Sequence, residues 1–571
     1  MTRVPGPFVL LDDARPGGGA ILYAGLQEVV ETRDPAEIHD CLERLRGKRA
    51  AGFLSYEAGH ALEPKLMPLA RQPDPDSPPL LWFGIFAEAV RGELAADPAG
   101  AWAGAARPLI SRAEYEAALA AVKANIFAGD IYQANLTFAA DVPIAGHPVA
   151  LYTALRERAR AGHGALVFTG THWLVSLSPE LFFTLEGGTA TARPMKGTAP
   201  PDADPEAFRA DPKQRAENLM IVDLLRNDLS RVARPGGVAV PALFEVETYP
   251  TLLQLTSTVT ARLEEGRDAI DLLKAIYPCG SITGAPKIRA MEIIDALEAS
   301  PRGPYCGAIG RLAPDGSASF NVAIRTLTLR DGAKTARLGL GSGIVADSEP
   351  AAEWDECLAK GRFVETQRRF DLIETMRFDP LDGVVDLERH LARLRASAEA
   401  LDFPFDRHEA RNELQAATFR AGPSKVRLLL SRSGAVAIEL RPLAPEPEDP
   451  VEVALARLPV DSDDFRLRHK TSDRAFYDEA RAASGAFEII FQDESGFLTE
   501  GSFTNIFLER GGKLLTPPLA RGLLPGVLRA RLLDEGKAME GELKAADLAG
   551  GFLLGNAVRG LVPARFRSAP A

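Results

Sequence analysis

Clusters of proline and acidic residues interrupt this 571-residue chain and set the limits of its compact units. They lie at residues 72–79, 95–108, 199–212 and 444–450. Proline cannot continue a helix or a central strand, so these clusters predict loops. A chain of this length is expected to build roughly three to five compact units. We predict domains 1–369 and 370–571, the second divided into a small lobe, 370–445, and a large lobe, 451–571.

Hydrophobic periodicity predicts an α+β fold for the chain. Apolar residues recur at helical spacing in 113–129, 207–233 and 387–401. Strand-like runs occupy 165–168, 173–177, 320–329 and 372–378. Residues 425–430 and 436–440 flank Arg432–Ala435 and predict a β-hairpin.

Charge and hydropathy exclude several kinds of partner. The 66 basic and 78 acidic side chains give a net charge of −12, which repels nucleic acid. No apolar run approaches the roughly 18 residues of a membrane-spanning helix, and the first twelve residues lack a secretory signal pattern. Four scattered cysteines fit a reducing compartment better than a disulfide scaffold or a zinc site. We therefore expect a cytoplasmic protein that acts on small molecules, with no nucleic-acid or membrane partner.

A first group of candidate residues surrounds Lys196. Its segment, Arg193–Thr198, follows the strand-like 181–185, and Gly197 lets the backbone pass close to a ligand. By itself the segment is better explained as a surface lysine beside a turn. Two neighbouring features favour a site: Glu180 beside a strand, and an acidic helical stretch that contains Glu217.

Carboxylates near residue 353 predict a metal site. Glu353 and Glu356 are three residues apart and share a face if the segment is helical. With Glu217 they offer the hard oxygen ligands that Mg²⁺ prefers, and the ion would face a carboxylate substrate. Spacing alone fits a solvated acidic helix equally well. The glycine-rich 339–343 just upstream offers backbone N–H groups to an anion, although any tight turn can use the same glycine pattern.

Residues 112–366 resemble the chorismate-utilising enzymes, which include anthranilate, isochorismate, salicylate and aminodeoxychorismate synthases. The motifs that carry the resemblance are Gly129–Leu136, Ser178–Glu180, Pro194–Thr198, the helix around Glu217, Gly280–Lys287, Ile324–Thr326 and Gly341–Ser348. Lys196 makes the chain similar to the aminodeoxychorismate synthases, since anthranilate synthases usually carry a small residue there. The resemblance implies a β-sandwich core flanked by helices, chorismate as substrate, and Mg²⁺.

The same resemblance implies roles for single residues. The Lys196 amine attacks C2 of chorismate as the C4 hydroxyl leaves, and ammonia then adds at C4. Glu180 protonates the departing hydroxyl. The implied substrate contacts are Thr283, Tyr305, Arg325, Gly341, Gly343 and Lys360. One departure is Gln254, which stands where a histidine is common.

A second group of residues lies in the C-terminal domain. Lys470 lies thirty residues before Glu500, and Arg393 lies upstream of both. Singly, each is a common surface residue. Together, residues 370–566 resemble the two-lobed fold-type IV pyridoxal phosphate enzymes, which include branched-chain and D-amino acid aminotransferases and aminodeoxychorismate lyases.

That resemblance implies a covalent cofactor site. Lys470 forms a Schiff base with pyridoxal 5′-phosphate, Glu500 pairs with the pyridine nitrogen, and Arg393 binds the phosphate. The remaining implied cofactor contacts are Val527, Leu528, Asn556 and Ala557. Segments 373–377 and 555–560 are closer to the lyases than to the branched-chain aminotransferases.

Together the two resemblances predict a bifunctional enzyme that makes 4-aminobenzoate from chorismate for folate synthesis. The alternative is an anthranilate synthase component I-like enzyme fused to an aminotransferase-like domain, and a degenerate, non-catalytic half is a third interpretation. No cysteine lies in a glutaminase nucleophile motif, so ammonia is expected from a separate glutamine amidotransferase subunit. A homodimer through the C-terminal domain is compatible with the resemblance.

Overall fold

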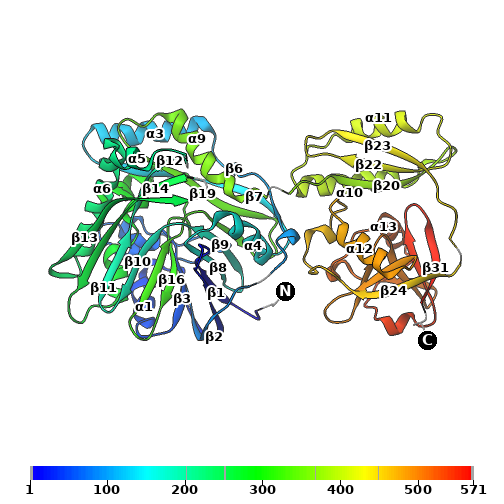
Figure 1. Cartoon of the computed structure of the whole chain (residues 1–571), viewed down its shortest axis with the longest axis horizontal. Helices are drawn as coiled ribbons and strands as arrows, with labels where there is room; N and C mark the ends of the chain where they lie inside the picture. Colours follow the sequence, from blue (N-terminus) through cyan, green and yellow to red (C-terminus); the bar gives the residue numbers. More distant parts are fainter. Residues whose placement is uncertain are drawn as a thin grey trace.

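A computed structural model describes residues 4–94, 96–200, 202–249, 252–366, 368–447 and 449–567. Figure 1 shows two bodies side by side, the first blue to green and the second yellow to red. Within the described residues no helix is long and apolar enough to cross a membrane.

The first body is built from nineteen strands and nine α-helices among the described residues. Its strands are β1 (Phe8–Asp12), β2 (Ala20–Thr32), β3 (Ala50–Leu54), β4 (Leu81–Arg91), β5 (Trp102–Ala103), β6 (Arg107–Pro108), β7 (Gln133–Ala145), β8 (His163–Phe168), β9 (His172–Ser178), β10 (Leu181–Glu186), β11 (Thr189–Arg193), β12 (Met195–Ala199), β13 (Ala233–Tyr249), β14 (Leu252–Leu263), β15 (Gly284–Ala285), β16 (Ala308–Leu312), β17 (Ala318–Val322), β18 (Thr326–Arg330) and β19 (Thr335–Ile344). Its helices are α1 (Ile38–Arg44), α2 (Ala58–Leu62), α3 (Arg112–Phe127), α4 (Pro148–Ala159), α5 (Pro205–Ala210), α6 (Pro212–Ser230), α7 (Ala269–Ile276), α8 (Lys287–Leu297) and α9 (Pro350–Gly361).

Antiparallel pairing links the long strands of this body into one continuous ribbon. It runs β13–β14–β11–β10–β17–β16–β3–β4–β2–β1–β8–β9–β18–β19–β7. A core that includes Phe53, Trp82 and Val167 fills the space between its two layers. Two larger cores lie under the helices, one beneath α1, α6 and α7 and the other beneath α3, α4 and α9. This confirms the predicted β-sandwich flanked by helices.

Two predicted elements of this body are interrupted. The predicted helix 207–233 is divided into α5 and α6 because Pro212 starts a new helix that Asp211 caps through the amides of Lys213 and Gln214. The predicted strand 320–329 breaks between β17 and β18, where Arg325 has a φ of 50°. Both breaks lie beside residues of the candidate site.

The second body has two lobes. The small lobe contains β20 (Leu372–Asp379), β21 (Gly383–Val384), α10 (Leu387–Ala400), α11 (Arg407–Thr418), β22 (Ser424–Leu430) and β23 (Val436–Pro442). The large lobe contains β24 (Val451–Arg457), α12 (Ala475–Ser484), β25 (Glu488–Gln492), β26 (Leu498–Gly501), β27 (Asn505–Arg510), β28 (Lys513–Thr516), α13 (Val527–Asp534), β29 (Ala538–Glu540), β30 (Phe552–Asn556) and β31 (Gly560–Phe566).

Each lobe is organised around one sheet. The small lobe has the strand order β21–β20–β22–β23, with α10 against β20 and α11 against β23. Leu430 pairs with Val436 in β22 and β23, which confirms the predicted hairpin. The large lobe has the order β26–β25–β24–β31–β30–β27–β28–β29. The chain thus has the predicted α+β fold, with a two-lobed body at its C-terminal end.

Candidate active sites

Lys196 lies at an irregular point of β12. The register against β14 shifts between Met195 and Thr198, which bulges Lys196 and Gly197 out of the regular ladder. Gly197 has a φ of 92°, and a β-carbon there would lie 2.5 Å from Oε1 of Gln214. Gln254 donates from Nε2 to the Gly197 carbonyl at 2.7 Å and holds the bulge. The strand therefore turns Lys196 toward the interior of the site.

The glycine-rich segment 339–343 lies in a strand rather than in a turn. Residues 335–344 form β19, which pairs with β7 along its whole length. A β-carbon on Gly339 would lie 2.0 Å from Cδ1 of Tyr305, and one on Gly341 2.6 Å from Cγ2 of Thr137. One on Gly343 would lie 2.7 Å from Nζ of Lys196. The glycines are needed because neighbouring side chains occupy the space above the strand.

Glu180 is a buried carboxyl next to this lysine. It follows β9, is 6 % exposed, and its Oε1 has no hydrogen-bond partner within the described chain. Burial raises the pKa of Glu180 to about 7, while a hydrogen bond from Ser281 and the charge of Lys196 oppose the rise. Burial and the neighbouring Lys360 lower the pKa of Lys196. The negative charges of Glu217, Glu180 and Glu356 oppose this shift only in part. The pair combines a proton donor with an amine that loses its proton more easily than usual.

The three predicted metal ligands lie on α6 and α9. The negative charges of Glu217 and Glu356 both raise the pKa of Lys196, so these two carboxylates face the same site. Glu356 pairs with Lys360 at 2.7 Å, and Glu353 accepts a hydrogen bond from Ser348 Oγ at 2.7 Å. In the described residues no three His, Cys, Asp or Glu side chains are grouped closely enough to hold a metal. The oxygen donors suit Mg²⁺, but a bound ion would have to displace these contacts.

The predicted substrate contacts differ in the contacts that they already make within the protein. Lys360 also donates to the Gly341 carbonyl at 3.0 Å. Thr283 is fully buried and its hydroxyl donates to the carbonyls of Cys279 and Gly280. Tyr305 packs on Gly339, and Arg325 lies at the break after β17. Thr283 is therefore occupied with holding the backbone.

Several buried polar residues of this body were not predicted as site residues. Gln133 is 1 % exposed, its Nε2 has no partner among the described atoms, and it lies 3.6 Å from the position of a Gly343 β-carbon. Lys287 and Asp228 form a buried ion pair, and Lys287 also donates to the Ile276 and Pro278 carbonyls. Gln133 and Lys287 lie inside the quoted motifs, which is the signal that could have identified them.

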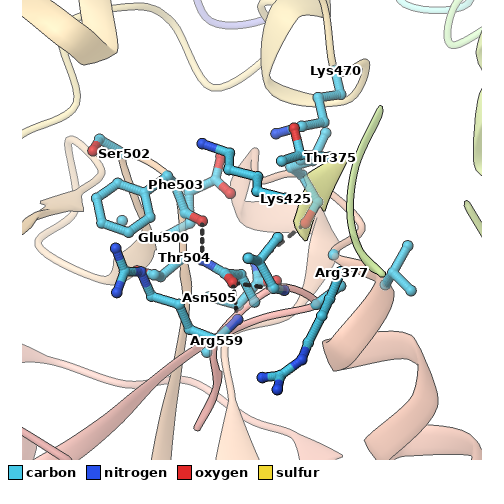
Figure 2. Close-up of a pocket in the computed structure, with 18 of the residues that line it drawn as sticks. Thr375, Arg377, Lys425, Lys470, Glu500, Ser502, Phe503, Thr504, Asn505 and Arg559 are labelled. Carbon is cyan, nitrogen blue, oxygen red and sulfur yellow. Dashed lines mark hydrogen bonds between the residues drawn. The ribbon is translucent and has the colours of Figure 1, made fainter. Parts of the chain in front are cut away.

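A cavity of about 930 Å³ lies between the two lobes of the C-terminal body. Six predicted cofactor contacts line it: Arg393, Lys470, Glu500, Val527, Asn556 and Ala557. Leu528 does not line it, because its side chain packs with Phe507 and Leu532 in a core. Figure 2 shows Lys470, Lys425 and Glu500 around the same space.

Lys470 and Glu500 have the properties of a cofactor pair. Burial lowers the pKa of Lys470 to about 7, helped by Arg474 and Arg393 and opposed by Glu374 and Glu500. Burial also raises the pKa of Glu500 to about 7, although Oε1 accepts a hydrogen bond from Tyr477 at 2.5 Å. A neutral amine can bond to an aldehyde, and a buried carboxyl can pair with a ring nitrogen. These residues therefore fit pyridoxal phosphate.

Arg393 is held by Glu374, a residue that the sequence did not single out. Glu374 accepts from Arg393 Nε at 2.8 Å and Nη2 at 2.6 Å, and contacts His390 Nδ1 at 2.6 Å. Burial raises the pKa of Glu374, but Arg393 and His390 outweigh burial and bring this pKa down to about 2. Glu374 remains ionised and fixes the guanidinium at the cavity wall.

The remaining predicted contacts lie in two turns. Gly526 precedes α13, whose first amides, from Val527 onward, have no acceptors inside the helix and suit a phosphate. Asn556 Oδ1 accepts from the amides of Val558 and Arg559 at 3.0 and 2.9 Å, and Nδ2 donates to the Phe503 carbonyl at 3.3 Å. The Asn556 side chain therefore shapes the turn that carries Ala557.

The cavity also has a cationic wall, which we define as Arg377, Lys425, Arg427, Arg441 and Arg559. Arg377, Lys425 and Arg441 are paired across β20, β22 and β23, and Arg427 lies two residues along β22 on the same face. Burial lowers the pKa of Lys425, and Arg427, Arg441 and Arg559 add to the effect. Nε of Arg427 is buried with no partner in the described structure. Like charges gathered in a cavity suit an anionic ligand.

The chain matches two family models in succession. Residues 91–366 match the chorismate binding enzymes, and residues 371–565 match the class IV amino-transferases. Aminodeoxychorismate synthase component 1 of Klebsiella aerogenes is 46 % identical over 44 % of this chain and 57 % of its own length. Anthranilate synthase component 1 of Streptomyces coelicolor is 42 % identical over 46 % and 52 %.

A solved structure agrees with the fold of the first body. Anthranilate synthase component I from Streptococcus pneumoniae is 25 % identical, with a TM-score of 0.51 over 64 % of this chain and 94 % of its own. The chain spans about half the length of each of these two curated relatives. Residues 91–366 belong to the chorismate binding enzymes and residues 371–565 to the class IV amino-transferases, so the chain joins both families.

Proposed function

We propose that the chain makes 4-aminobenzoate from chorismate in two steps, for folate synthesis. The N-terminal half converts chorismate and ammonia to 4-amino-4-deoxychorismate and water. The C-terminal half converts that product to 4-aminobenzoate and pyruvate. The observation that carries the proposal is Lys196, a lysine with a lowered pKa beside the buried acid Glu180. In support, 261 residues of the chain are 46 % identical to a named aminodeoxychorismate synthase component.

The first reaction uses groups of the chain itself. The neutral Lys196 amine bonds to C2 of chorismate as the C4–O bond breaks, and Glu180 gives its proton so that water leaves. Ammonia then bonds to C4 as the C2–N bond breaks, which returns Lys196. We infer that Glu217, Glu353 and Glu356 would hold Mg²⁺, which when bound supplies positive charge for a substrate carboxylate.

The second reaction needs an electron sink, which pyridoxal phosphate supplies when bound. Lys470 would hold the cofactor and move the proton at C4 of the substrate, and Glu500 would hold a proton at the pyridine nitrogen. The cationic wall supports a substrate with two carboxylates, as 4-amino-4-deoxychorismate has. It favours the lyase over an aminotransferase for amino acids with one carboxylate.

Ammonia would come from a separate glutamine amidotransferase, as the name "component 1" of the relatives suggests. We further propose that the two activities divide near residue 370, between the two family matches. We also propose that two copies of the chain form a homodimer through their C-terminal halves.

Product analysis tests this function. The full chain is supplied with chorismate, ammonium, Mg²⁺ and pyridoxal phosphate. We expect 4-aminobenzoate and pyruvate in equal amounts, whereas anthranilate would identify the alternative function. Lys196→Ala should stop consumption of chorismate while isolated 4-amino-4-deoxychorismate is still converted. Unchanged amination by this variant would reject Lys196 as the nucleophile.

A further inference from the structure

Residues 97–103 of the N-terminal half lie against the C-terminal half. Trp102 is completely buried and belongs to the small-lobe core, together with Phe370 and Phe465. The Arg432 guanidinium lies 4.9 Å above its ring. A tryptophan from one half thus completes a hydrophobic core of the other, so the two halves meet in a specific arrangement.

The same segment contacts the stretch of chain that carries Lys470. Asp97 Oδ2 accepts from Nη2 of Arg466 at 3.0 Å. Gly100 approaches so closely that a β-carbon there would lie 3.1 Å from Oδ2 of Asp464. Asp464 in turn caps the short helix Phe465–Leu467 by accepting from the Arg466 amide at 2.9 Å. Asp97 and Gly100 therefore support the turn four residues before Lys470.

Arg466 connects this contact to the cofactor cavity. It is 8 % exposed, lines the cavity with Lys470, and lies 4.9 Å above the ring of Phe476. Its guanidinium pairs with Asp464 at 2.5 Å and lies 3.8 Å from Asp473, three residues after Lys470. A buried guanidinium needs these acids, because an unpaired buried charge is costly.

The other side of Lys470 is fixed within the C-terminal half. Its carbonyl accepts from the Ile373 amide at 2.9 Å, and Thr471 forms a bridge with Leu372. A second cavity of about 650 Å³ between the two halves reaches His469, which lines the cofactor cavity as well. Lys470 is thus held between β20 and the contact with the N-terminal half.

We propose that Asp97, acting through Arg466, is a positioning residue for Lys470, so that the N-terminal half completes the cofactor site of the C-terminal half. The proposal rests on the proposed role of Lys470 in holding pyridoxal phosphate. It gives the fused chain a function that two separate enzymes would lack: the second site is fully formed only when the first half is folded beside it.

The charged groups that face Lys470 set the direction of the effect. They are Arg393 and Glu374 from the small lobe and Arg474 and Glu500 from the large lobe. Asp97 neutralises part of the positive charge of Arg466, which lies next to these groups in the cavity wall. A cation in place of Asp97 adds positive charge and loosens the turn, so it weakens cofactor binding and makes the lysine nitrogen easier to deprotonate.

The test compares full-length Asp97→Lys, Asp97→Glu and wild type by equilibrium titration with pyridoxal phosphate, followed by absorbance. Asp97→Lys should weaken binding about three- to tenfold and lower the pH midpoint of the bound-cofactor absorbance. Asp97→Glu should restore both values. Glu28→Lys is the matched control, because Glu28 is an equally exposed acid paired with Arg44 at 2.7 Å within the N-terminal half.

Chorismate consumption with ammonium should be unchanged in all variants, since Asp97 has no contact with Lys196. Should Asp97→Lys fold poorly, Asp97→Asn carries the same test with a smaller expected change. Wild-type affinity and midpoint in the folded variant would overturn the positioning role. A wild-type chain without Lys470-dependent absorbance would instead reject the proposed function itself.

Discussion

Nζ of Lys196 lies 2.7 Å from the position that a β-carbon on Gly343 would occupy. The reactive amine on β12 thus lies directly against a residue of β19 that has no side chain. We therefore predict that Gly343→Ala displaces the lysine. Misplacement of a reacting group by about 1 Å can cost roughly 100-fold in rate. We expect a loss of about this size in chorismate consumption with ammonium, and no change in conversion of 4-amino-4-deoxychorismate.

Gly92→Ala is the control for this substitution, since a β-carbon there meets nothing within 4 Å. Wild-type amination by Gly343→Ala would mean that Lys196 has room to rearrange without loss of function.

The burial of Glu180 predicts a pH dependence of the first reaction. With a pKa of about 7, Glu180 is protonated below that value and loses its proton as the pH rises through it. The reaction needs the protonated form, so kcat/KM should fall above about pH 7. Glu180→Gln should lower the rate about 100-fold or more and remove this part of the profile. A profile unchanged by the substitution would assign the titration to another group.

The carboxylates on α6 and α9 predict a metal dependence confined to the first half. A chelator should stop amination of chorismate and leave the second reaction intact. Glu356→Gln removes one ligand charge and the partner of Lys360, so it should raise the Mg²⁺ concentration needed for half-maximal rate. Glu116→Gln, on the exposed face of α3, is the control. Equal metal dependence in both variants would place the ion elsewhere.

Lys470→Ala should give a protein without the absorbance of lysine-bound pyridoxal phosphate. Supplied with chorismate and ammonium, it should accumulate 4-amino-4-deoxychorismate, because the N-terminal site is unaffected. Lys425→Ala, in the same cavity, should retain the absorbance. Release of 4-aminobenzoate by Lys470→Ala at the wild-type rate would show that this half is not the lyase.

The cationic wall predicts the substrate preference of the second half. Arg427→Ala should raise KM for 4-amino-4-deoxychorismate about tenfold, with a smaller change in kcat and no change in cofactor absorbance, because it removes a contact to a carboxylate. Arg395→Ala, an exposed arginine of α10 paired with Glu399, should be neutral. An unchanged KM would remove the wall from substrate binding.

Local patterns predicted much of the fold. The hairpin 425–430 with 436–440 is confirmed because alternation and a short turn depend only on neighbouring residues. The helix 207–233 was predicted without its break, although Asp211 and Pro212 carry a local signal for a new helix start. The glycine run 339–343 left the local structure open, because the same glycines can serve a turn or a crowded strand, and only the contacts with Tyr305, Thr137 and Lys196 explain why they are needed in β19.

The two families, the order of the two halves and the motifs around Lys196 and Lys470 can be recognised without a structure, since they depend on residue identity and spacing along the chain. Which groups surround those two lysines follows from how the chain folds in three dimensions. Glu374 holds Arg393, which lies 19 residues away in the sequence, and Asp97 contacts Arg466, which lies 369 residues away. Burial, which brings the pKa values of Glu180, Lys470 and Glu500 to about 7, also depends on atoms contributed by distant segments. Such contacts leave no periodic or local signal, because they exist only once the sheets and lobes have packed together.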